Sequence, residues 1–247
     1  PVRAAEAARR PARRVHGGRR RAPGATLRAR RGAPWAGGAG GRTAEAAWLA
    51  AIDGSVSHEG EGIYGGQAVA AGVAAAMAGA PTVAVIASAL AVIPDDSWTA
   101  RSLRRAVAVA HHGERAVRSA VVIGGYPWTD LAPEAVALAF GAYAAADGDF
   151  RDAVLTAVNM GRDADTTAAV AGALAGATQG VSAIPPEWGT AITAARGTCL
   201  PAMAGRHVLE MADLLTPAPP DLAHEEQRPP AETTFTLAAD DGAGAGR

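Results

Sequence analysis

The feature that most restricts the folding of this chain is an uncharged run over residues 62–94. Such a run must leave water, either by crossing a bilayer or by entering a protein core. Small residues dominate it, Pro81 interrupts it, and no second convincing span follows. We therefore predict a buried helical hairpin, with helices over residues 64–78 and 81–92, and no membrane association.

Small apolar residues supply most of the remaining core. Hydrophobic residues make up 49% of the chain and aromatic residues only 4%, a composition that suits helices in close contact. Apolar spacing predicts a helix that starts at a capping Thr43. It also predicts helices over residues 98–111, 133–146, 150–159, 165–179, 186–195 and 206–215. Only residues 120–123 offer a strand signal, so the predicted fold class is all-α.

Charge divides the chain into two kinds of sequence. Residues 1–42 contain twelve arginines and one acid, Glu6, whereas the rest carries an excess of acids. We expect disorder in this first segment, one helical domain over residues 43–215, and a poorly ordered tail over residues 216–247. A basic arm for nucleic acid is one interpretation, but GC-rich codons read in a wrong frame yield the same composition. We favour the second interpretation and expect no nucleic-acid partner. The single cysteine, Cys199, excludes an internal disulfide and indicates a cytoplasmic protein.

The segment Gly-Arg-Asp-Ala-Asp-Thr-Thr at 161–167 lies where a helix is predicted to start. Asp163, Asp165 and Thr166 can turn hard oxygen donors towards one point, which suits Mg²⁺. The structural alternative is that the two acids only cap the helix and complement its dipole. Small residues at 168, 172, 176 and 180 favour a metal, because a deeply buried helix start would need a cation beside its acids.

A second candidate segment is rich in glycine and leads into the helix predicted from Tyr64. Glycines let the backbone turn tightly beside a ligand, and helix N-termini bind phosphate. An ordinary turn is the alternative. The candidate ligand-binding residues are Ser57, His58, Gly62, Gly65 and Gly66.

Together these segments resemble the ADP-ribosylglycohydrolase family. The resemblance covers residues 53–195 and is carried, in the family's order, by residues 55–66, 93–97, 148–150, 161–166 and 184–188. It implies a compact multi-helix bundle that hydrolyses the bond between ribose C1'' and an acceptor such as arginine or serine. The expected partner is an ADP-ribosylated protein or a small ADP-ribose compound, and the expected cofactor is a pair of Mg²⁺ ions.

The resemblance also implies roles for individual residues. Asp163, Asp165 and Thr166 correspond to metal ligands, and the two aspartates also to catalytic residues. His58 and the residues around it, Ser57 and the three glycines, would line the ADP-ribose pocket.

Two departures from the family pattern leave a second reading open. Family members carry Gly-Asp-x-x-Gly and Thr-x-Asp-Asp motifs early in the chain, and residues 1–42 stand in their place without either motif. Arg162 stands where many members have glycine, and we expect it to add a positive charge beside the site. The alternative is therefore a catalytically inactive or truncated member, with its N-terminal part missing or replaced and with a binding or structural role.

Overall fold

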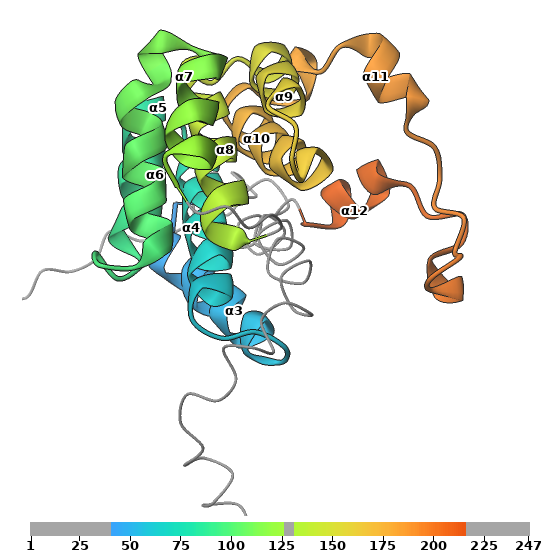
Figure 1. Cartoon of the computed structure of the whole chain (residues 1–247). Helices are drawn as coiled ribbons and strands as arrows, with labels where there is room; N and C mark the ends of the chain where they lie inside the picture. Colours follow the sequence, from blue (N-terminus) through green and yellow to red (C-terminus); the bar gives the residue numbers. More distant parts are fainter. Residues whose placement is uncertain (1–40, 126–130, 216–247) are drawn as a thin grey trace, which may run out of the picture. The chain divides into compact units, whose positions relative to one another are not determined.

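The structure, a computed structural model, describes residues 41–125 and 131–215, and within these ranges it contains helices and no β-strand. The predicted all-α fold class is confirmed. The larger helices are α3 (Thr43–Ser55), α4 (Glu61–Met77), α5 (Thr82–Ala91), α6 (Trp98–Val109), α8 (Ala132–Ala145), α9 (Phe150–Asn159) and α10 (Ala164–Gln179) (Figure 1). Three shorter helices are α7 (Glu114–Arg118), α11 (Pro186–Ala191) and α12 (Val208–Leu215). The disorder expected over residues 1–42 and 216–247 falls, except at Gly41 and Arg42, outside the described ranges.

Two local predictions are wrong. The strand expected at residues 120–123 is a π-helical turn, Ser119–Ile123, that continues α7. Its valines gave the strand signal, but Val121 is instead buried against the other helices. The cap expected at Thr43 is also absent, since α3 begins at Thr43 itself and Arg42 occupies the N-cap position without a side-chain cap.

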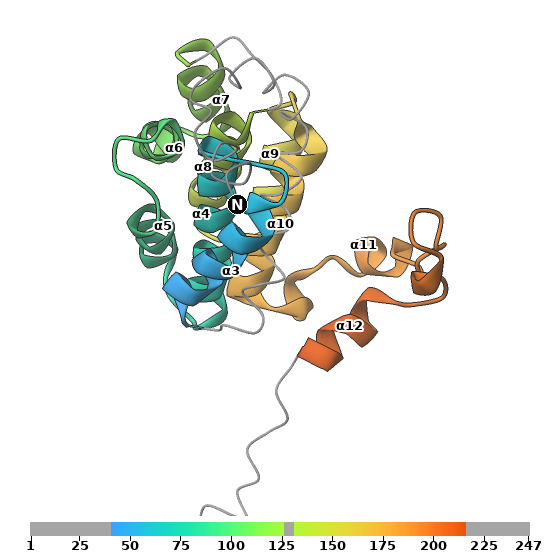
Figure 2. The same ribbon diagram turned by 90° about the horizontal axis from the view of Figure 1, so that it is seen from below.

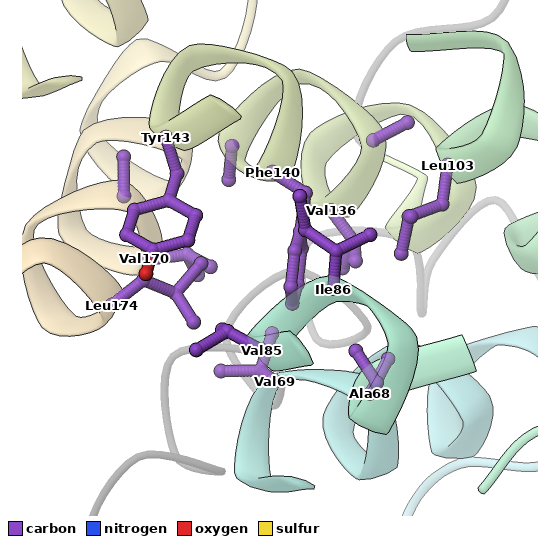
Figure 3. Packing of buried hydrophobic residues seen from close by; sticks show 14 of the residues in the cluster. Ala68, Val69, Val85, Ile86, Leu103, Val136, Phe140, Tyr143, Val170 and Leu174 are labelled. Atoms are coloured by element: carbon purple, nitrogen blue, oxygen red, sulfur yellow. The ribbon is translucent and has the colours of Figure 1, made fainter. Parts of the chain in front are cut away.

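Helix α8 forms the centre of the core, and every residue from Ala132 to Tyr143 is buried. Phe140 and Tyr143 of this helix lie among aliphatic side chains of α4, α5 and α10 (Figure 3). Gly72 of α4 permits this packing, because a Cβ atom there would lie 2.9 Å from Cζ of Phe140 and 3.0 Å from Cδ2 of Leu174. Small residues thus bring α4, α8 and α10 into close contact, as the composition predicts.

Helices α4 and α8 run in the same direction. A Cβ atom on Gly65, near the start of α4, would lie 2.9 Å from Cβ of Ala132 at the start of α8. Further along both helices, Gly72 faces Phe140. The first turns of α4 and α8 therefore lie at the same end of the bundle.

Helices α6 and α10 share this direction. At the start of α6, the backbone N–H of Thr99 donates to Glu61 at the start of α4. Arg162, just before α10, pairs with Glu134 in the first turn of α8. Towards the other end, the hydroxyl groups of Tyr143 in α8 and Thr178 in α10 lie 2.8 Å apart.

Four helices thus begin at one end of the bundle, which we call the N-terminal end. Figure 2 shows α3, α8 and α10 gathered around α4. Helices α3 and α9 run in the opposite direction, as the contacts of Gly54 with Ile63 and of Gly176 with Phe150 show. The aligned dipoles of α4, α6, α8 and α10 give the N-terminal end a partial positive charge.

Candidate functional site

The loop between α9 and α10 holds the predicted metal ligands. Its backbone is left-handed at two consecutive residues, Gly161 (φ 69°) and Arg162 (φ 65°). Asp163 then occupies the N-cap position of α10, but its carboxylate does not accept the capping hydrogen bond from the helix. The loop thus turns sharply into α10 at the position that the sequence predicted, while the proposed capping role of Asp163 is not seen.

Solvent exposure differs among the three predicted ligands. Thr166 is buried, Asp163 is half-buried and Asp165 is exposed. The expected deep burial of the acidic helix start is therefore wrong for Asp165. The face of small residues on α10 is only half-buried, and at Gly172 and Gly176 it meets side chains of α9 rather than a second backbone.

By their chemistry, the donor atoms of these three residues suit a Mg²⁺ ion whose remaining ligands are water. Two carboxylates and the Thr166 hydroxyl are the hard oxygen ligands that this ion prefers. Next to them, the Oγ1 atom of Thr167 is buried and has no hydrogen-bond partner among the described residues. In residues 41–125 and 131–215, however, no group of three or more His, Cys, Asp or Glu side chains is arranged to hold a metal.

Arg162, which we expect to add a positive charge beside these ligands, has an acidic partner in the structure. Its guanidinium turns to α8, where Nε and a terminal nitrogen each donate to Glu134 at 2.8 Å. The Glu134 side chain is only 7% exposed. Sequence reasoning missed this pair, because Glu134 gives no signal beyond that of an acid in the first turn of a helix.

The glycine-rich segment is helical over most of its length. Helix α4 begins at Glu61, three residues before the predicted start, so Gly62, Gly65 and Gly66 lie buried in its first two turns. Gly65 faces α8 and thereby has a packing role. The tight turn lies earlier, at Gly60, whose φ is 56°.

Ser57 and His58 lie in the loop that leads into α4. Oγ of Ser57 is 2.8 Å from Nδ1 of His58, and the histidine is half-buried. Because α4 and α10 start at the same end of the bundle, the structure brings this loop and the segment 163–166 to the N-terminal end.

Glu61 is a further carboxylate at this end that the sequence did not mark as important. Its two oxygens accept hydrogen bonds of 2.8 Å from the backbone N–H groups of Trp98 and Thr99 and from the Thr99 hydroxyl. Glu61 thus caps α6 from a distance of 37 residues in sequence. The start of α4 and the start of α6 are joined by this side chain.

None of the helices in the described part of the chain combines the length and apolar character needed to cross a bilayer.

Comparison with known proteins places this chain near one family. A model of the ADP-ribosylglycohydrolase family matches residues 2–221.

Two curated relatives match locally. ADP-ribosylarginine hydrolase Tri1 of Pseudomonas putida (strain GB-1) is 60% identical over 40 residues, which are 16% of this chain and 11% of the relative. ADP-ribosyl-[dinitrogen reductase] glycohydrolase of Rhodospirillum rubrum is 56% identical over 39 residues, 16% of this chain and 13% of the relative. The matched part of the chain thus spans only a small fraction of either relative.

Proposed function

Because the chain belongs to the ADP-ribosylglycohydrolase family, we propose that it hydrolyses the bond between ribose C1'' and the acceptor of an ADP-ribosyl group. The observation that best supports this proposal is the common direction of α4 and α10. It brings Ser57 and His58 to the same end of the bundle as Asp163, Asp165 and Thr166. A ligand at this end meets both a positive dipolar surface and a set of oxygen donors.

The acceptor that we propose is arginine. One curated relative is named an ADP-ribosylarginine hydrolase, and its matched segment is 60% identical to this chain. An arginine-linked substrate is a modified protein or a small guanidine compound. The exposed position of Asp165 supports a bulky acceptor, because the N-terminal end opens to solvent there.

We place the activity in the cytoplasm, because the single cysteine, Cys199, is free, as is usual for proteins of reducing compartments.

The residues at the N-terminal end would have separate roles in substrate binding and in hydrolysis. The diphosphate would lie against the loop before α4, where the first amides of that helix and the ring of His58 can donate hydrogen bonds. Asp163, Asp165 and Thr166 would hold Mg²⁺, which when bound orients ribose hydroxyls and lowers the pKa of water. Asp165 has the solvent access that a proton acceptor for the attacking water needs.

The test is release of ADP-ribose from ADP-ribosylated arginine and serine peptides, followed by chromatography with and without Mg²⁺. We expect Mg²⁺-dependent release from the arginine peptide and a loss of about 10²-fold or more in Asp165→Asn. The matched control is Asp152→Asn, since Asp152 is also an exposed first-turn aspartate but lies in α9, which starts at the opposite end. Equal release by Asp165→Asn, or no release from either peptide, would contradict the proposal. Calorimetric binding of ADP-ribose without any release would support the inactive, binding alternative.

A further inference from the structure

We infer that the buried ion pair between Arg162 and Glu134 is a positioning device that holds the loop 160–163 so that Asp163 and Asp165 can bind a divalent cation. The chemistry of the loop rests on the proposed function above. The restraint itself rests only on the geometry of the pair, the backbone of the loop and the burial of α8.

The backbone of the loop requires a restraint. Arg162 has a φ of 65°, in the left-handed region that a side chain with a Cβ atom disfavours. Without an external contact, an arginine there would relax towards the common right-handed or extended regions. The residue with the unfavourable backbone conformation, Arg162, is therefore also the residue that forms the ion pair with Glu134.

The contact between Arg162 and Glu134 is a pair of hydrogen bonds from one guanidinium to one carboxylate, which we call the fork. Two nitrogens of Arg162 donate to the two oxygens of Glu134, both at 2.8 Å. Such paired hydrogen bonds define the orientation of the guanidinium plane as well as its distance. Because the pair is largely buried, with exposed fractions of 19% and 7%, water does not compete strongly for either partner.

The anchor of the fork is rigid. Glu134 belongs to α8, in which every residue from Ala132 to Tyr143 is buried. A second arginine fixes the other side of the loop, since Nε of Arg118 donates to the carbonyl oxygen of Met160 at 2.9 Å. The loop is thus held at both its first and its third residue before α10 begins.

Metal ligands must stay close to one geometry to bind tightly, and groups that orient them without touching the metal change its affinity about 10- to 100-fold. Only arginine can supply the fork, because the lysine ammonium is a single point of charge. A change of Arg162 to lysine therefore keeps the charge and most of the side-chain length but removes the restraint.

The experiment compares Arg162→Lys and Glu134→Gln with Arg206→Lys, a matched control in an exposed pair with Glu210. Three quantities are measured on the full chain: Mg²⁺ affinity by calorimetry, amide hydrogen exchange over residues 160–167, and kcat and KM for the arginine peptide. We expect Arg162→Lys to weaken Mg²⁺ binding at least about tenfold and to speed exchange over 160–167. Exchange in α4 should stay unchanged, and raising the Mg²⁺ concentration should restore much of kcat. The control should match the unaltered protein in all three measurements.

The outcomes separate this inference from the proposed function. If the unaltered protein neither binds Mg²⁺ nor releases ADP-ribose, the proposed function fails, whereas exchange over 160–167 still decides whether the pair restrains the loop. If the protein is active but Arg162→Lys has unchanged exchange and unchanged Mg²⁺ affinity, the inference is overturned. Should Arg162→Lys fail to fold, Glu134→Gln gives the same comparison, because it retains the side-chain shape and one acceptor oxygen.

Discussion

The role of Glu61 follows from its hydrogen bonds. Both of its oxygens are bound to the first turn of α6, by three hydrogen bonds of 2.8 Å. A carboxylate held in this way satisfies two of the N–H groups that a helix start leaves without partners. Glu61 stabilises the fold and does not act as a proton acceptor in the mechanism that we propose.

The first prediction therefore concerns stability. Glu61→Ala should lower the free energy of unfolding by about 1–2 kcal/mol, because the N–H groups of Trp98 and Thr99 lose their acceptor, while the Ser97 cap of α6 remains. The measurement is urea unfolding followed by circular dichroism. Glu59→Ala is the control, since Glu59 is exposed and close by, and its midpoint should stay near that of the unaltered protein. Similar midpoints for the two variants would show that the cap contributes nothing.

The second prediction uses two glycines inside helices. Gly72→Ala should destabilise the protein by about 1–3 kcal/mol, because the new methyl group would overlap the side chains of Phe140 and Leu174. Gly176→Ala should be neutral or stabilising by up to about 1 kcal/mol, since its methyl group would lie 3.6 Å from Phe150 and alanine favours helix. Thermal unfolding of the two variants measures the difference. A lower melting temperature for Gly176→Ala than for Gly72→Ala would contradict the packing described for α4.

For single residues, the sequence predicted where the loop before α10 lies but not which contacts the loop makes. The spacing of Asp163, Asp165 and Thr166 placed them at a helix start, since capping and helix preference are local properties. The fork between Arg162 and Glu134 joins residues 28 positions apart, so no local pattern encodes it. The exposure of Asp165 was likewise unpredictable, because it depends on which neighbour covers α10.

Among the elements, burial is very uneven. Helix α8 is buried over almost its whole length, whereas α11 and α12 contain no buried residue. Trp188 of α11 lies beside Phe150 of α9, with ring centroids 6.2 Å apart. Local unfolding free energies follow such differences in burial.

The third prediction is an order of hydrogen exchange. Amides of α8 should exchange slowest, at rates set by global unfolding, and amides of α12 should exchange fastest among the helices. Mass spectrometry of peptic peptides resolves both helices. Comparable protection in α12 and α8 would contradict the lack of buried residues in α12.

Element boundaries were predictable where a capping residue marks them. Helix α9 spans residues 150–159 as predicted, and the Asp149 side chain accepts a hydrogen bond from the backbone N–H of Asp152 at its start. Helix α11 stops at Ala191 instead of residue 195, and no capping side chain marks its start. Periodic apolar residues thus predicted that a helix exists more reliably than where it ends.

For the whole molecule, the exposed apolar face of α3 affects behaviour in solution. Trp48 and Ile52 of α3 and Val56, the residue after its end, follow one another at intervals of four and are 60%, 49% and 81% exposed. The opposite face of α3 packs on α4 through small residues. A contiguous apolar stripe of this kind favours association between molecules.

The fourth prediction is that the chain associates as its concentration rises, and that the double change Trp48→Gln and Ile52→Gln reduces this association. Sedimentation velocity over a range of concentrations measures it. Val83→Gln is the control, because Val83 is 80% exposed on α5 but does not belong to the stripe. Equal association of the double variant and the control would exclude α3 as the surface involved.

Helices α4, α6, α8 and α10 all begin at the N-terminal end of the bundle, and this arrangement matters for protein engineering. Residues such as Ser57, His58 and Asp165 lie before or at the beginning of a helix, whereas Gly72 and Phe140, on which the packing depends, lie about two turns or more deeper. A library randomised at the outer positions would therefore retain folded protein in most of its members. Substrate preference can then be selected independently of the hydrophobic interior.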